Sequence, residues 1–209
     1  MPRLIDLGLA RLRELIYMMH SMVKEAFKHT RRCLSNISEC DPETIRPLSR
    51  KIIELRDEAV ALAAEIIARY QPVARDLRLV ISSMEVSYDL FRITRYLSET
   101  MRIVGVAGLS DCRFEQALAL LDKVEVMVEL AVSAYTSTDV EKAKKVIELD
   151  NTIDEAYLST VKQLLSRECI TSCSAVELLI LRHWERIADH ASYMAISAYY
   201  VATGNRLEH

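Results

Sequence analysis

Hydrophobic residues recur every three or four positions through most of the chain, which is the spacing of one face of an α-helix. Turn and capping residues interrupt this pattern at Asp41-Pro42, Gln71-Pro72, Gly105 with Gly108, Thr138-Asp139 and Ser174. The breaks predict six long helices, over about residues 4–34, 42–70, 72–104, 111–135, 138–167 and 174–204. Alternating runs typical of strands are not apparent, so the predicted fold class is all-α.

The two halves of the chain resemble each other. A shift of 94 residues places Ile53-Glu54-Leu55 on Ile147-Glu148-Leu149, and the same shift places Arg92-Ile93 on Arg186-Ile187. Three predicted helices stand on either side of the glycine pair. We therefore expect two tandem three-helix bundles related by internal duplication.

The predicted boundary lies at the middle of the chain. Residues 1–107 would form the first bundle and residues 108–206 the second, whereas residues 207–209 look like the remnant of an expression tag. The 209 residues are 51% hydrophobic and include only four glycines and four prolines, which suits long helices with short connections.

Charge and hydropathy narrow the function classes. A net charge of −3 gives no indication of nucleic-acid binding. No charge-free apolar run is long enough to span a bilayer, and the first residues lack the apolar core of a signal peptide. We therefore expect a cytoplasmic protein. The five cysteines fit no zinc spacing and are expected to be reduced thiols.

Two pairs of acidic residues stand four positions apart within apolar helical sequence. Asp150 and Asp154 form one pair, and Glu185 and Asp189 form the other. This spacing places both carboxylates of a pair on one face of a helix, where they repel each other unless a cation or a basic partner is near. Two such helices side by side would suit a metal that prefers oxygen ligands.

The alternative is local ion pairing without a metal. Arg182 and Arg186 stand close to Glu185 in the sequence, and two lysines stand close to Glu148. Surface pairs of this kind contribute little stability. The nearby His183, Trp184 and His190 are interpreted as packing or surface residues rather than ligands.

Three segments together resemble one known family. They are Arg182 to Ala191 with the helix end at Gly204, Ala143 to Tyr157, and Gln71 to Arg78. All three are similar to signatures of the phosphate-uptake regulator family, PhoU, and the resemblance covers about residues 10 to 204.

The resemblance implies a non-enzymatic regulator built of two three-helix bundles. Such a protein restrains a phosphate ABC transporter, contacting its ATPase, and helps a membrane sensor kinase to report phosphate sufficiency. It would reach the membrane through these partners and would commonly form a homodimer. The family's acidic motifs can bind Fe or other metals, so Fe, Mn, Zn or Mg is the expected cofactor class, although metal-free members also exist.

The first half departs from the family pattern. The shift of 94 residues places Arg56 and Val60 on the positions of Asp150 and Asp154, and Phe91 and Arg95 on those of Glu185 and Asp189. All four acidic positions are lost there. We therefore predict at most one metal site, formed by Asp150, Asp154, Glu185 and Asp189.

The sequence argues against one class of metal enzyme. A ferritin-like di-iron enzyme needs Glu-x-x-His on two helices, and this sequence contains no such motif. A PhoU-like regulator of an ion channel or cation transporter, or a general helical scaffold, remains the alternative. The tip of the first hairpin is basic and is either a solvated surface or a contact for anionic lipid or an acidic partner; its residues are Lys28, His29, Arg31, Arg32, Arg46, Arg50 and Lys51.

Overall fold

The computed structural model describes residues 3–166 and 168–207, and within them it contains helices and turns but no strand. The six long helices are α1 (Leu4–Ser35), α2 (Arg46–Tyr70), α3 (Ala74–Ala107), α4 (Glu115–Ser137), α5 (Val140–Leu165) and α6 (Ser172–Thr203). Two short 3-10 turns, Ile37–Glu39 and Pro42–Ile45, separate α1 from α2. The all-α prediction of six helices is confirmed.

Side-chain caps begin α5 and α6, and a glycine ends α6. The carboxylate of Asp139 accepts the backbone N–H groups of Glu141 and Lys142 at 3.0 and 3.1 Å and so begins α5. Thr171 begins α6 by accepting the N–H of Ser174 at 3.2 Å, two residues earlier than the predicted start. Gly204 ends α6 in the left-handed region, with φ at 83°, where glycine carries no steric penalty.

Two boundaries near the middle of the chain differ from the prediction. Helix α3 continues through Gly105 to Ala107 and ends at Gly108, whose φ is 59°. Gly105 is needed for close approach instead, because a Cβ there would lie 2.8 Å from Cγ of Pro42. Helix α4 begins at Glu115 rather than near residue 111, because the preceding Phe114 is not helical.

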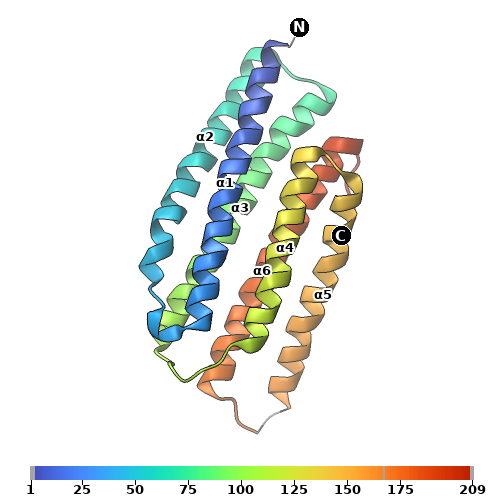
Figure 1. Cartoon of the computed structure of the whole chain (residues 1–209). Helices are drawn as coiled ribbons and strands as arrows, with labels where there is room; N and C mark the ends of the chain where they lie inside the picture. Colours follow the sequence, from blue (N-terminus) through green and yellow to red (C-terminus); the bar gives the residue numbers. More distant parts are fainter. Residues whose placement is uncertain (1–2, 167, 208–209) are drawn as a thin grey trace.

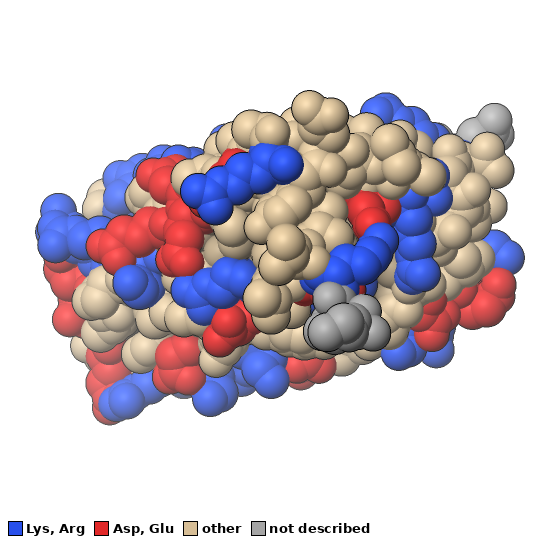
Figure 2. All heavy atoms as spheres, turned by 90° about the horizontal axis from the view of Figure 1, so that it is seen from above, with Lys and Arg blue, Asp and Glu red and all other residues tan. Residues whose placement is uncertain are grey.

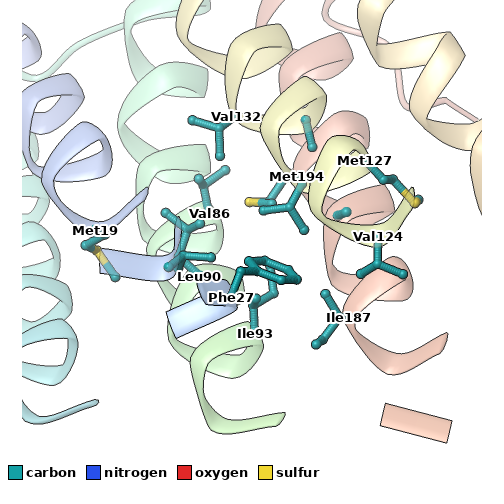
Figure 3. Packing of buried hydrophobic residues seen from close by; sticks show 14 of the residues in the cluster. Met19, Phe27, Val86, Leu90, Ile93, Val124, Met127, Val132, Ile187 and Met194 are labelled. Atoms are coloured by element: carbon teal, nitrogen blue, oxygen red, sulfur yellow. The ribbon is translucent and has the colours of Figure 1, made fainter. Parts of the chain in front are cut away.

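The helices form two groups of three that lie side by side (Figure 1). Helices α1, α2 and α3 make one group and α4, α5 and α6 the other, and the groups meet where α3 packs on α6 and α1 on α4. The buried apolar side chains form one cluster that continues across this junction. Figure 3 shows Phe27 of α1 close to Ile93 of α3, with Ile187 of α6 beside them.

One large side chain in the second half anchors α6 to α4. Trp184 is fully buried, and its indole N–H donates to the carbonyl oxygen of Ala117 at 2.9 Å. The interpretation of Trp184 as a packing residue is confirmed. The predicted tag remnant begins at Leu207, and its last two residues lie outside the described part of the chain.

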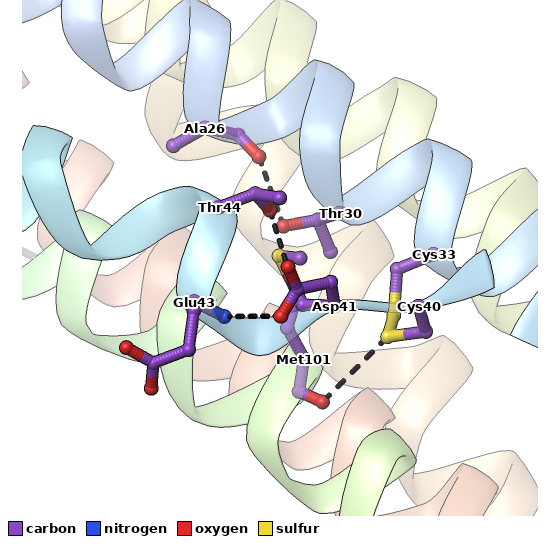
Figure 4. The surroundings of a disulfide bond; sticks show 8 residues. All are labelled: Ala26, Thr30, Cys33, Cys40, Asp41, Glu43, Thr44 and Met101. Carbon is purple, nitrogen blue, oxygen red and sulfur yellow. Dashed lines mark hydrogen bonds between the residues drawn. A yellow bond between two sulfur atoms is a disulfide. The ribbon is translucent and has the colours of Figure 1, made fainter.

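The cysteines correct one expectation. Cys33 and Cys40 form a disulfide, as do Cys112 and Cys173, whereas Cys169 is an exposed thiol. The first bond closes the turn after α1, with Sγ of Cys40 lying 3.8 Å from the carbonyl oxygen of Met101 (Figure 4). The second joins the loop before α4 to the start of α6. The spacing of the cysteines in the sequence could not reveal which of them are bonded. The packing of the helices brings the bonded cysteines together at one end of the molecule.

Candidate functional site: the acidic cluster of α5 and α6

The four predicted site residues lie on the two helices that were expected to carry them. Asp150 and Asp154 stand on α5, and Glu185 and Asp189 stand on α6, which packs against α5. Asp150 is buried with 3% of its surface exposed, and Asp154 is half-buried. The side chains of Glu185 and Asp189 are 14% and 18% exposed. The carboxylates therefore stand at the edge of the core, as expected for acids within apolar helical sequence.

Two arginines of α6 balance this acidic charge. Arg182 forms an ion pair with Glu185, and Arg186 Nη1 lies 3.0 Å from Oδ2 of Asp189. Arg186 Nε also lies 3.6 Å from Oε2 of Glu185, an oxygen that is buried and accepts no hydrogen bond from any described residue. Local ion pairs, the alternative to metal binding, are thus present.

The carboxylates also influence one another. Burial raises the pKa of Glu185, and the neighbouring Asp189 and, more weakly, Asp154 raise it further, while Arg182 and Arg186 oppose the rise. This coupling places acids of α5 and α6 in one electrostatic cluster. It also shows that positive charge is needed here, because a buried carboxylate without compensation is costly.

The fit of a metal can be judged from these contacts. Carboxylate oxygens are suitable ligands for a hard cation. In residues 3–166 and 168–207, however, no group of three or more His, Cys, Asp or Glu side chains is placed to hold a metal ion. Arg182 and Arg186 already pair with Glu185 and Asp189, the two acids of α6. The metal site at Asp150, Asp154, Glu185 and Asp189 stays a prediction, and Arg182 and Arg186 would compete with a metal for Glu185 and Asp189.

The corresponding place in the first half contains a different contact. Arg56 of α2 lies over the ring of Phe91 of α3, with 4.7 Å from its guanidinium carbon to the ring centre. Arg56 also pairs with its neighbour Asp57 at 2.7 Å. A cation held on an aromatic face thus stands where the second half carries acids and arginines.

The basic tip of the first hairpin is largely neutralised by its own neighbours. Arg31 binds Asp122 and Glu125 of α4 at 2.7 and 2.6 Å. Other ion pairs of the tip are Lys28–Glu25, His29–Glu25, Arg32–Glu39, Arg46–Glu43 and Lys51–Glu54. This pairing favours the interpretation of a solvated surface.

Sequence reasoning missed a polar pair at the junction of the two halves. Asp89 of α3 is 4% exposed, and its Oδ1 lies 2.8 Å from Nδ1 of His190 on α6. Burial raises the pKa of Asp89, and His190 opposes that rise. His183 makes a similar bond across the junction, with its Nδ1 2.8 Å from Oγ1 of Thr100. Asp89 follows Glu85 by four positions in the sequence, but its partner is 101 positions away, so no local pattern could reveal the pair.

Curated relatives match almost the whole chain. A protein of Synechocystis named "Phosphate-specific transport system accessory protein PhoU homolog" is 27% identical over 208 residues, which are 95% of this chain and 91% of that protein. A protein of Archaeoglobus fulgidus with the same name is 29% identical, with 90% of each chain covered.

The fold is also found in a solved structure. The crystal structure of PhoU from Pseudomonas aeruginosa superposes with a TM-score of 0.83 at 24% identity and covers 96% of this chain and 99% of that one. The model of the PhoU domain matches residues 16–104 and 118–198, one stretch in each half. The chain therefore belongs to the PhoU domain family.

Proposed function

We propose that this protein is a non-enzymatic regulator of phosphate uptake that acts in the cytoplasm as an adaptor between a phosphate ABC transporter and a sensor kinase. The observation that carries the proposal is the family match in both halves. In addition, the chain matches nearly the whole length of relatives that are named as accessory proteins of phosphate transport. The protein would work as a homodimer and would reach the membrane through its partners. None of its described helices is long and apolar enough to cross a bilayer.

One end of the molecule offers a surface suited to a protein partner. The turn that carries Gln71 and Pro72 joins α2 to α3 beside the start of α1, and a recess of about 350 Å³ opens there. Leu4, Tyr70 and Val73 line it and are 76%, 40% and 75% exposed. Figure 2, which looks onto this end, shows uncharged side chains between groups of charged ones. Exposed apolar side chains with a charged rim are typical of protein interfaces.

A capture experiment tests the proposal. Tagged protein would be recovered from membranes of cells grown at high and low phosphate, and the bound proteins identified by mass spectrometry. We expect the transporter ATPase and a sensor kinase, with recovery that depends on phosphate. Val73→Asp in the recess should reduce recovery at least about tenfold, because it buries a charge in an apolar contact.

The matched control is Leu158→Asp on α5, where an apolar side chain is 53% exposed outside the recess. This variant should capture partners as the parent protein does. Normal phosphate uptake and normal phosphate-responsive transcription in a deletion strain would contradict the regulatory role. Capture of potassium-transport or channel subunits instead would support the alternative partner class.

A further inference from the structure

A cavity of about 600 Å³ opens between α3 and α6, and its lining includes none of the four acids of the candidate site and none of the residues at the Gln71 recess. Its walls include three tyrosines, Tyr88 of α3 and Tyr193 and Tyr200 of α6. Tyr88 and Tyr193 are 47% and 46% exposed, which is high for aromatic side chains at a helix junction. Both rings contact the His190 ring in a T-shaped arrangement, at 6.3 and 5.7 Å between ring centres, and about half of each side chain still reaches the cavity or solvent.

Two carboxylates stand among these rings. Glu85 lines the cavity, and its Oε2 accepts the hydroxyl of Ser197 at 3.0 Å. Asp89 lines it as well and is nine-tenths or more buried, held by His190. Aromatic faces are negative, so rings and carboxylates together make a site that attracts cations and repels anions such as phosphate.

A third feature is a cation supplied by the chain itself. Arg206, in the short segment that follows α6, lines the same cavity. Nearby, the guanidinium carbon of Arg78 lies 5.8 Å from the centre of the Tyr200 ring. Guanidinium groups thus already lie at this cavity and on one of its tyrosines.

We propose that this cavity is a binding site for an organic cation, a guanidinium or alkylammonium group that stacks on Tyr88, Tyr193 and Tyr200 and pairs with Glu85, and that Arg206 competes with it for the carboxylates. Such a group is carried by small polyamines and by the arginine or lysine side chains of proteins, and the chemistry of recognition is shared. The inference does not rest on the phosphate-transport role. It assigns the cavity to a cation although the protein's relatives are named for the transport of an anion.

The test is calorimetric titration of the full-length protein at pH 8, with agmatine, spermidine and an arginine-containing tripeptide amide as cationic probes and inorganic phosphate as the anionic probe. We expect binding of the cations and none of phosphate. Tighter binding of the tripeptide than of agmatine and spermidine would point to a protein source, and the reverse to a small molecule.

Three variants make the expectation sharp. Glu85→Gln and Tyr88→Leu should each weaken cation binding by about tenfold or more, because each removes one favourable charge interaction. Arg206→Ala should strengthen it, since a competing cation is removed. The matched control is Glu65→Gln, which changes an exposed glutamate of α2 that pairs with Arg69. Circular dichroism would verify that every variant is folded.

The opposite results would overturn the proposal. Binding of phosphate that is lost in Arg206→Ala would identify an anion site. No binding of any cation at millimolar concentration, by either the parent or Arg206→Ala, would show that the cavity is not a cation site. Equal weakening by Glu85→Gln and Glu65→Gln would show that bound cations associate with the surface at large.

Discussion

Arg56 and Phe91 face each other across α2 and α3, with the guanidinium carbon 4.7 Å from the ring centre. The shift of 94 residues matches these two residues to Asp150 and Glu185, which stand on the equivalent helices of the second half. The matched positions therefore carry a cation over a ring in the first half and carboxylates in the second.

This contact can be measured by a double-mutant cycle. Arg56→Ala and Phe91→Ala, alone and combined, should show a coupling of about 0.5–1 kcal/mol in the free energy of unfolding, the usual range for a partly exposed cation–π pair. Urea unfolding followed by circular dichroism provides the values. Strict additivity of the two single variants would mean that the pair contributes no interaction of its own.

The acidic cluster leads to a prediction about metal retention. Protein loaded with Fe, Mn, Zn or Mg and then desalted should retain metal at one site at most. The double variant Asp150→Asn/Asp189→Asn should retain none. Because Arg182 and Arg186 stand among the carboxylates, replacing both with Gln should tighten metal binding by about tenfold or more. Metal content would be read by mass spectrometry.

The control for the metal experiment is Glu148→Gln, which changes an exposed glutamate of α5. It should leave metal content unchanged. Retained metal in the Asp150/Asp189 double variant would show that the ion binds elsewhere, and an unaltered affinity in the arginine variant would show that the arginines do not compete.

The two disulfides should differ in their contribution to stability. Cys112 and Cys173 are 61 residues apart, so their bond restricts a long loop of the unfolded chain and should contribute about 4 kcal/mol. Cys33 and Cys40 are 7 residues apart, and the same chain-entropy argument yields about 2 kcal/mol. Denaturant unfolding of Cys112→Ser/Cys173→Ser and Cys33→Ser/Cys40→Ser, each compared with and without reductant, measures both.

Alkylation before and after reduction provides the chemical control. The oxidised protein should label at Cys169, the thiol outside the two bonds, and the reduced protein should label at all five cysteines. Full labelling without reductant would contradict the disulfides.

The half-buried His20 should lower the free energy of unfolding in mild acid. Burial, assisted by the charge of Lys24, lowers the pKa of His20 from its ordinary 6.5 to about 4, and its buried Nε2 has no hydrogen-bond partner among the described residues. The unfolded chain therefore takes up the proton first as the pH falls. The contribution of neutral His20 is fully present above pH 6.5 and decreases by about 3 kcal/mol as the pH approaches 4.

Stability curves of His20→Leu at several pH values test this expectation. The variant should lose less stability than the parent between pH 6.5 and 4. His29→Gln, on the same helix, should keep the dependence of the parent. Parallel curves for the parent and His20→Leu would assign the acid sensitivity to other groups.

The helices were predictable because their signals are local. Apolar spacing, the turn at Thr138-Asp139 and the stop at Gly204 act within a few residues, and the structure uses each of them, although the cap is Asp139 rather than Thr138. The role of Gly105 was not predictable, because it depends on Pro42, which approaches from another part of the chain.

The site was predictable only in part for the same reason. Asp150, Asp154, Glu185 and Asp189 could be found from their spacing and from the family resemblance. The balance between acids and arginines depends on the side-chain placement of Arg182 and Arg186, which spacing does not determine. The pairing of Asp89 with His190 joins the two halves, and a pattern within one helix contains no information about it.

The apolar cluster shared by the two halves restricts how this protein can transmit a signal. A hinge that opened between α3 and α6 would bring Ile93 and Ile187 into water, so the halves are expected to move together as one lever. A partner bound at the Gln71 end would then set the orientation of the opposite end, which carries the two disulfides, and so of a second partner bound at that end. The signal would be transmitted by a rotation of the whole molecule rather than by a change in the angle between its two halves.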